Sequence, residues 1–125
     1  MESRLSQLSA ERGWEADGRF VTVGVAGGRT KTVRCEEIDE GDGKMLRIST
    51  IVGDAAQLSA SRMNAALVLN WRIRHGALAI HDGMVVMTDF ITNRKATDEM
   101  IAEVIQYLAM TADTYAAHLL SPQET

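Results

Sequence analysis

The C-terminal part of the chain holds the feature that most constrains the fold, a long amphipathic helix predicted over residues 97–120. Such a helix is roughly 36 Å long at about 1.5 Å per residue. In a chain of 125 residues, it must cover a whole sheet or reach a second subunit. Its apolar residues recur at helical spacing, at Met100, Ile101, Val104, Ile105, Leu108, Ala112, Tyr115 and Leu119.

Composition and charge exclude several classes of partner. The net charge of −4 argues against nucleic acid, because phosphate binding needs a basic surface. No apolar run approaches the roughly 20 residues of a membrane helix, and the N-terminus lacks the pattern of a signal peptide. The single cysteine, Cys35, has no partner for an internal disulfide and fits a reducing compartment. We therefore expect a cytoplasmic protein with no nucleic-acid and no membrane partner.

The first part of the chain predicts one helix followed by an antiparallel meander. A helix over residues 2–14 places Leu5 and Leu8 on one face. The apolar period then changes to two, which predicts strands over residues 19–26, 29–37 and 44–52. Glycine-rich turns at residues 27–28 and 41–43 join these strands in antiparallel order. The predicted inward residues are Val21, Val23, Val25, Val33, Cys35, Leu46, Ile48 and Val52.

The second part predicts another helix and a hairpin before the long C-terminal helix. Ser59 or Ser61 can cap a helix that runs to about Arg74. Two strands, over residues 77–80 and 84–88, flank an Asp-Gly step typical of a type I′ turn. The helix has a wide apolar arc, which indicates contact on two sides, formed by Met63, Ala66, Leu67, Leu69, Trp71 and Ile73.

These elements predict a single α+β domain over residues 1–125. Their order is α-β-β-β-α-β-β-α, and the strands form a five-stranded antiparallel sheet. Residues 1–3 and 121–125 are expected to be loose ends.

No group of residues predicts a reaction, a cofactor or a metal site. His81 and Asp82 lie in a predicted turn, and adjacent residues of extended chain point to opposite faces. His75 and His118 lie at helix ends, where a partly charged imidazole complements the helix dipole. Cys35 falls on an apolar strand face, where a thiol behaves as a small hydrophobe. We therefore predict no catalytic, cofactor-binding or metal-binding residue.

A small enzyme or ligand sensor is the alternative function. It requires a concave polar cleft, because its candidate residues are far apart in the sequence. Those residues are Arg72, Arg74, His75 and Cys35.

The predicted sheet is apolar on both faces. Met45, Ile51, Met84 and Val86 lie opposite the predicted core positions of their strands. Either a partner covers this second face, for which flexible methionines are suited, or helices of the same chain cover both faces. Apolar residues away from the main stripe of the long helix also indicate a dimer contact, at Tyr107 and Met110.

Several segments carry a family resemblance. Together with the element order, they resemble the type III secretion chaperone-like superfamily, and within it the YbjN-like proteins. The local marks are Asn70 late in the second helix, Gly76 before the fourth strand, and the Ala112-Asp113 pair of the last helix. The segments are residues 66–71, 76–83, 85–87 and 112–115.

The resemblance implies a small, acidic, homodimeric bacterial protein without catalytic residues. Secretion chaperones of this superfamily hold an unfolded segment of an effector along apolar patches, partly by adding a strand to a sheet edge. We therefore expect a non-enzymatic module that binds a peptide segment or a protein partner of unknown identity. The expected binding face bears Met45, Ile51, Met84 and Val86.

Overall fold

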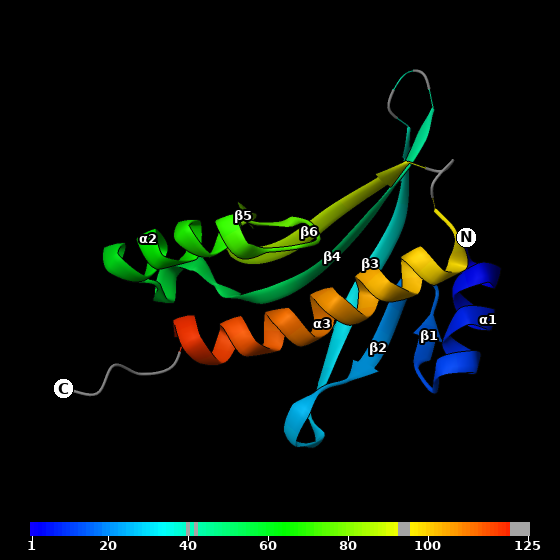
Figure 1. The fold of residues 1–125 in the computed structure, drawn as a ribbon, viewed down its shortest axis with the longest axis horizontal. Helices are drawn as coiled ribbons and strands as arrows, with labels where there is room; N and C mark the ends of the chain where they lie inside the picture. Colours follow the sequence, from blue (N-terminus) through cyan, green and yellow to red (C-terminus); the bar gives the residue numbers. More distant parts are fainter. Residues whose placement is uncertain (40, 42, 93–95, 121–125) are drawn as a thin grey trace.

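The computed structural model describes residues 1–39, 41, 43–92 and 96–120. Its strands form one six-stranded sheet in the order β1-β2-β3-β4-β6-β5, and all neighbouring strands are antiparallel. The long helix α3 (Asp98–Leu120) lies across one face of this sheet (Figure 1). The predicted α+β class is therefore confirmed. No helix in the described part of the chain is long and apolar enough to cross a membrane.

The other elements follow the predicted order, with one addition. The prediction of five strands is wrong, because a short strand, β1, precedes the meander and adds a sixth. The described connections include the short 3-10 helices η1 (Ala26–Gly28), η2 (Ala55–Gln57) and η3 (Asn70–Arg72). The remaining elements are α1 (Glu2–Arg12), β1 (Glu15–Asp17), β2 (Phe20–Gly24), β3 (Thr30–Asp39), β4 (Lys44–Asp54), α2 (Ala60–Leu69), β5 (Ala77–His81) and β6 (Met84–Thr92).

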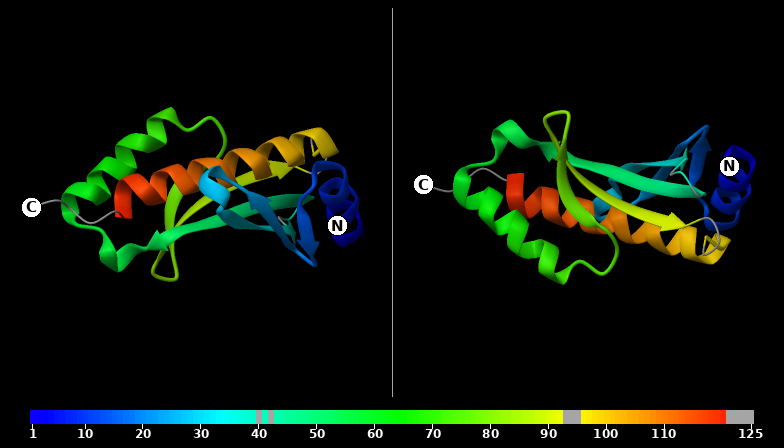
Figure 2. Two further views of the ribbon diagram at one scale, coloured as in Figure 1. Left: turned by 90° about the horizontal axis from the view of Figure 1, so that it is seen from below. Right: turned by 90° about the horizontal axis from the view of Figure 1, so that it is seen from above.

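Helix α3 supplies one side of the core. Thr97 begins it, since its hydroxyl oxygen accepts a hydrogen bond from the Met100 N–H at 3.1 Å. Met100 was predicted to be a core residue, but 37% of it is exposed. The first turn of α3 lies at the margin of the molecule, beside α1 (Figure 2). The side chains that are buried between α3 and the sheet include Val33, Leu46, Ile48, Met87, Ile101, Val104, Ile105 and Leu108.

Helix α1 closes one end of the molecule. Arg4 donates hydrogen bonds to the Asp98 carboxylate and to the Ala96 carbonyl oxygen, which joins α1 to the start of α3. Helix α1 includes Glu2 and Ser3, part of the stretch expected to be loose. The other expected loose end, residues 121–125, lies outside the described residues.

Helix α2 lies at the opposite end, beside the C-terminal turns of α3 (Figure 2). Ser59 caps it, as predicted, by accepting a hydrogen bond from the Arg62 N–H at 3.2 Å. The Arg62 side chain donates to the carbonyl oxygens of His118 and Leu119 at 3.0 and 2.7 Å. A cation at these carbonyl groups complements the helix dipole. The contact therefore fixes the end of α3 against α2.

Two of the predicted turns are confirmed. Gly27 and Gly28 have φ angles of 71° and 73° at the tip of the β2–β3 hairpin. Asp82 and Gly83 connect β5 to β6 with φ angles of 50° and 75°. Positive φ at both central residues defines the type I′ turn that the sequence predicted. The turn predicted at residues 41–43 includes Asp42, which lies outside the described residues.

Candidate partner-binding site

The sheet face opposite α3 is the candidate site, and we call it the open face. Buried residues such as Val33, Leu46 and Met87 point toward α3, and their strand neighbours point the other way. No helix of the described structure covers those neighbours (Figure 1). The chain's own helices therefore do not cover both faces. The open-face residues of the central strands include Arg34, Glu36, Met45, Arg47, Ser49, Ile51, Met84, Val86, Thr88 and Phe90.

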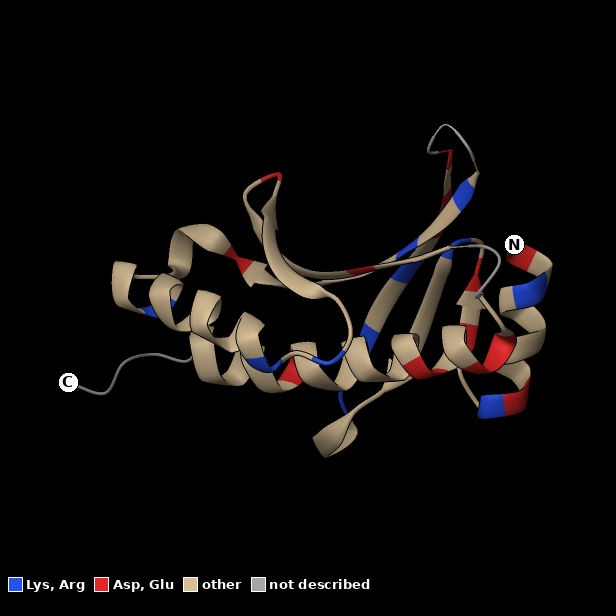
Figure 3. Cartoon of the chain, turned by 45° about the horizontal axis from the view of Figure 1, so that its top comes forward, with Lys and Arg blue, Asp and Glu red and all other residues tan. Residues whose placement is uncertain are grey.

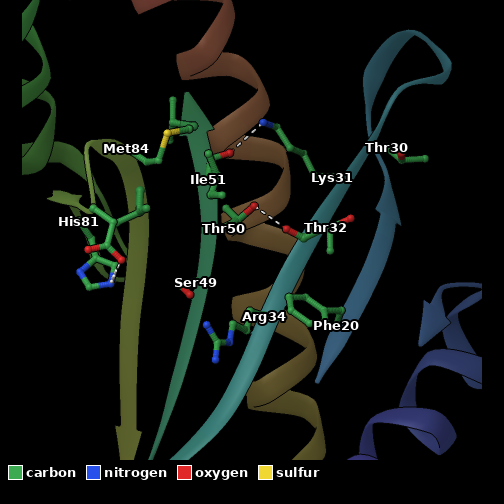
Figure 4. A pocket seen from close by; sticks show the side chains of 13 residues that line it. Phe20, Thr30, Lys31, Thr32, Arg34, Ser49, Thr50, Ile51, His81 and Met84 are labelled. Carbon is green, nitrogen blue, oxygen red and sulfur yellow. Dashed lines mark hydrogen bonds and ion pairs between the residues drawn. The ribbon is translucent and has the colours of Figure 1, made fainter. Parts of the chain in front are cut away.

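Three of the four predicted binding residues meet in one hollow of the open face. Ile51 of β4 lies opposite Val86 of β6, and Met84 lies two residues from Val86 on the same strand. The hollow has a volume of about 590 Å³, in the range of sites that hold drug-sized ligands. Other residues that line it include Phe20, Arg34 and Ser49 (Figure 4).

Met45, the fourth predicted residue, lies elsewhere on the same face. It is opposite Thr92 on β6 and Ile38 on β3. It precedes Ile51 by six positions on β4, a separation of roughly 20 Å at about 3.3 Å per residue. The structure therefore separates Met45 from the other three residues.

A second hollow continues the first along β4 and β6. It has a volume of about 230 Å³ and shares Arg34, Ser49 and Val86 with the larger hollow. We call the two hollows together the groove. The residues that line only the smaller hollow include Glu36, Arg47, Thr88 and Phe90.

Three arginines surround Glu36, and two of them, Arg34 and Arg47, line this second hollow. Arg47 donates to Glu36 Oε1 from Nε at 2.8 Å and from Nη2 at 2.5 Å. Arg34 Nη2 and Arg19 Nη1 lie 3.0 and 3.9 Å from Glu36 Oε2. Three positive charges against one negative charge leave this part of the open face locally basic, although the whole chain is acidic. Figure 3 shows lysine and arginine positions along the strands of the sheet.

The arginines also determine the charge of Glu36. Burial by itself raises the pKa of this carboxyl group. The hydrogen bonds from Arg47 and the positive charges of Arg47, Arg34 and Arg19 outweigh burial, so the pKa is lower than its usual value. Glu36 is therefore ionised at neutral pH and holds Arg34 and Arg47 in place.

The sequence did not identify two aromatic residues of the groove. Phe90 was missed because the strand was predicted to end at residue 88, whereas β6 continues to Thr92. Its parity with Met84 and Val86 was the signal that could have identified it. Phe20, at the start of β2, lies beneath the Arg34 guanidinium, which is 6.0 Å from the ring centre.

The predicted dimer residues lie on a different side of the molecule. The Tyr107 hydroxyl oxygen accepts a hydrogen bond from the Arg74 N–H at 3.0 Å, and the tyrosine ring meets the His75 ring edge-on. Contacts within the chain therefore use part of the Tyr107 side chain that was predicted to face a second subunit. Met110, one turn further along α3, is 49% exposed.

Helix α2 and the η3 turn that follows it expose three large apolar side chains. Leu67 is 65% exposed, Val68 is 60% exposed and Trp71, in η3, is 94% exposed. Ala66 is the buried residue of α2. The sequence predicted contact on two sides of this helix, and the chain itself covers one of them.

The structure does not form the polar cleft that the enzyme alternative requires. Cys35 points into the core, and burial raises the pKa of its thiol to about 12. A thiol with such a pKa is not a nucleophile at neutral pH. Arg74 and His75 instead pack against Tyr107 on the outer side of α3. Within the described ranges, no three His, Cys, Asp or Glu side chains are grouped so that they could hold a metal ion.

Comparison with known proteins supports the fold. No protein-family model matches the sequence, and no curated protein matches it. A chain in the crystal structure of the ExsC–ExsE complex is similar, with a TM-score of 0.68 and 13% identity over 98% of this chain and 95% of that chain. A chain in the structure of the HopA1–SchA chaperone–effector complex has a TM-score of 0.54 and 11% identity over 85% and 84%. The likeness establishes the type III secretion chaperone-like fold that the sequence resemblance implies.

Proposed function

We propose that this chain is a non-enzymatic, chaperone-like binding module that holds an extended segment of a partner polypeptide on its open face. The observation that carries this proposal is the groove, which places Ile51, Met84 and Val86 in an uncovered hollow of about 590 Å³. A sheet face that is apolar and unpartnered is typical of an interaction surface. The proposed binding site therefore contains three of the four residues that the sequence predicted, since it omits Met45.

The similar structures support a protein as the partner. One of them is a chaperone–effector complex, and this chain shares its fold across most of its length. The flexible thioether of Met84 suits segments of varied shape. A closer kinship with YbjN-like proteins stays a prediction from the sequence.

Binding to a library of short synthetic peptides tests the proposed site. We expect the full-length M84S/V86S variant to bind the captured peptides about thirtyfold more weakly, because each substitution removes an apolar contact of roughly 1 kcal/mol, or about 2 kcal/mol for the pair. The M100S variant is the control, since Met100 is an exposed methionine of α3 on the far side of the sheet. Unchanged binding by M84S/V86S, with its thermal unfolding also unchanged, contradicts the proposal.

We further propose that the module is a homodimer. Arg74, three residues after Trp71, contacts Tyr107, so the end of α2 and the middle of α3 are neighbours. Met110 and the exposed residues of α2 would then be covered by a second copy. Exposed tryptophans are frequent energetic centres of interfaces.

Light scattering during size-exclusion chromatography tests the dimer. We expect twice the mass of one chain at micromolar concentration. W71A should raise the dimer dissociation constant by about thirtyfold, the effect of a loss of roughly 2 kcal/mol, and M110A should raise it less. A strict monomer for the unmodified chain contradicts the dimer proposal and leaves the binding proposal standing.

A further inference from the structure

We infer that the groove selects an acidic segment of its partner. The segment is extended and carries an apolar residue, an aspartate or glutamate two positions later, and a second apolar residue two positions after that. This inference deepens the proposed function and rests on it, because it assumes a polypeptide on the open face.

The groove contains three rows of side chains that follow the period of a strand. Successive rows are two residues apart along β4 and β6, or about 6.6 Å at about 3.3 Å per residue. The same distance separates alternate side chains of an extended segment. The first row pairs Ile51 with Val86, the second joins Arg34, Ser49 and Thr88, and the third joins Glu36, Arg47 and Phe90.

The arginines of the second and third rows can bind an additional carboxylate. Arg34 uses one terminal nitrogen on Glu36, and Arg47 uses Nε and one terminal nitrogen. A guanidinium has five N–H donors, so each arginine retains donors beyond these contacts. Their side chains are 46% and 41% exposed, and a single carboxylate faces three positive charges. An acidic side chain placed here would form charge-assisted hydrogen bonds.

A hydroxyl group in the second row suits the same ligand chemistry. Ser49 of β4 lies opposite Arg34 of β3 and lines both hollows of the groove. Its hydroxyl can donate a hydrogen bond to a carboxylate oxygen. The second row therefore presents guanidinium and hydroxyl donors that an acidic side chain would satisfy and an apolar side chain would not.

Apolar contacts lie on both sides of this polar row. Ile51 is 53% exposed in the first row, and Phe90 is 46% exposed in the third. Neither is covered by another element of the described structure. They therefore define the two apolar positions of the segment.

The sheet edges are less suited to this segment than the open face. At the β5 edge, the Asn70 side chain accepts from the Leu78 N–H at 2.6 Å and donates to the Leu78 carbonyl oxygen at 3.2 Å. It thus takes the place of a neighbouring strand at that residue. The opposite edge is β1, three residues long, where Glu15 and Asp17 would repel an acidic segment.

Three fluorescent peptides, identical except at the central position, test the inference. Their core is leucine, threonine, glutamate, threonine and phenylalanine, with glutamine or lysine in place of glutamate in the other two. With the full chain, we expect anisotropy to show binding of the glutamate peptide about tenfold tighter than that of the glutamine peptide. The lysine peptide should bind more weakly than both.

Two substitutions distinguish recognition by the arginines from a structural role. R34Q should abolish the preference for glutamate, whereas R12Q, on α1, should leave it unchanged. E36Q should tighten binding of the glutamate peptide, because it removes the carboxylate that competes for Arg34 and Arg47. A purely structural arginine cluster predicts that E36Q weakens binding or leaves it unchanged, and that result overturns the inference.

The outcomes separate the two proposals. Equal affinity for the glutamate and glutamine peptides, or no binding of any of the three, overturns the acidic preference. If all three bind equally and M84S weakens them all, the open face remains the binding site and only the preference is lost. If M84S changes none of the affinities, the proposed function itself fails.

Discussion

At the scale of single residues, Gly76 lies just before β5 at a position where a side chain would not fit. Its φ angle is 75°, and a Cβ atom there would lie 2.2 Å from the Thr88 carbonyl oxygen. That oxygen belongs to the backbone of β6, so it cannot move without disturbing the sheet. Gly28 also has a positive φ, of 73°, but no atom lies within 4 Å of its Cβ position.

This pair of glycines gives a controlled prediction. We expect G76A to lower the free energy of unfolding by about 3 kcal/mol or more, because it combines left-handed strain with a backbone clash. G28A should cost only the strain, roughly 1–2 kcal/mol. Urea denaturation measures both free energies of unfolding. Equal losses for the two variants would show that a Cβ atom at residue 76 does not clash with the β6 backbone.

Asp113 of α3 anchors the β2–β3 hairpin to the helix. Arg29 donates to its two carboxylate oxygens at 3.0 and 2.7 Å. The hydrogen bonds from Arg29, aided by the charges of Arg29 and Lys31, lower the pKa of Asp113 against the opposing effect of burial. A carboxylate held in this way stabilises the folded state only while it is ionised.

The stabilisation by Asp113 should depend on pH. Because its folded-state pKa is lower than the unfolded value of about 3.9, the contribution is complete above that value and disappears as pH falls through the folded pKa. Urea denaturation of D113N and the unmodified chain should therefore differ at pH 7 and converge in strong acid. A difference that persists unchanged below both pKa values contradicts this account of the ion pair.

The sequence located these residues without revealing their contacts. Gly76, Asn70 and Asp113 were marked by the family resemblance, but their roles depend on Thr88, Leu78 and Arg29. Arg29 and Asp113 are 84 positions apart, and no local spacing rule relates residues at that distance. The polarity of the groove was missed for a related reason. Arg34 and Glu36 share a face of β3 by local spacing, but Arg47 meets Glu36 only through the register of β3 and β4.

At the scale of elements, β5 is an edge strand that the chain closes with a side chain. Asn70 pairs with both backbone groups of Leu78, and the next outward-facing residue is Ile80. An uncovered edge is a template for association with another chain. Asn70 therefore limits pairing at this edge.

Replacement of Asn70 should expose the edge. We expect N70A to lower the free energy of unfolding by about 1–2 kcal/mol, because two partly buried hydrogen bonds are lost. The Leu78 amide should also exchange with deuterium faster, relative to amides in the centre of the sheet. Unaltered exchange at Leu78 would show that Asn70 does not protect the edge.

The elements that the sequence predicted well were those with a long, regular pattern. The order of helices and of the five longer strands was correct, and α3 begins within one residue of the predicted start. β1 was missed because its three residues, Glu15–Asp17, are too few to establish a period of two. For α2, the wide apolar arc predicted two contact surfaces. The chain itself covers one of them, and contact at the other stays a prediction.

At the scale of the whole molecule, α3 covers one face of the sheet and leaves the other open (Figure 1). The sequence predicted that both faces are apolar, and the path of the chain decides which one is covered. The same long helix that predicted the fold class thus also defines the open face, because it covers the sheet on one side only.

Methyl NMR of the full chain tests the open face most directly. The seven methionines are distributed over both sides of the sheet. Addition of the glutamate peptide should shift the methyl signals of Met84, Ile51 and Val86, which line the groove. Met87, buried beneath the same strand, and Met110, on the outer side of α3, should stay unchanged. Shifts confined to Met63 and Met110, with Met84 and Ile51 unaffected, would contradict binding at the open face.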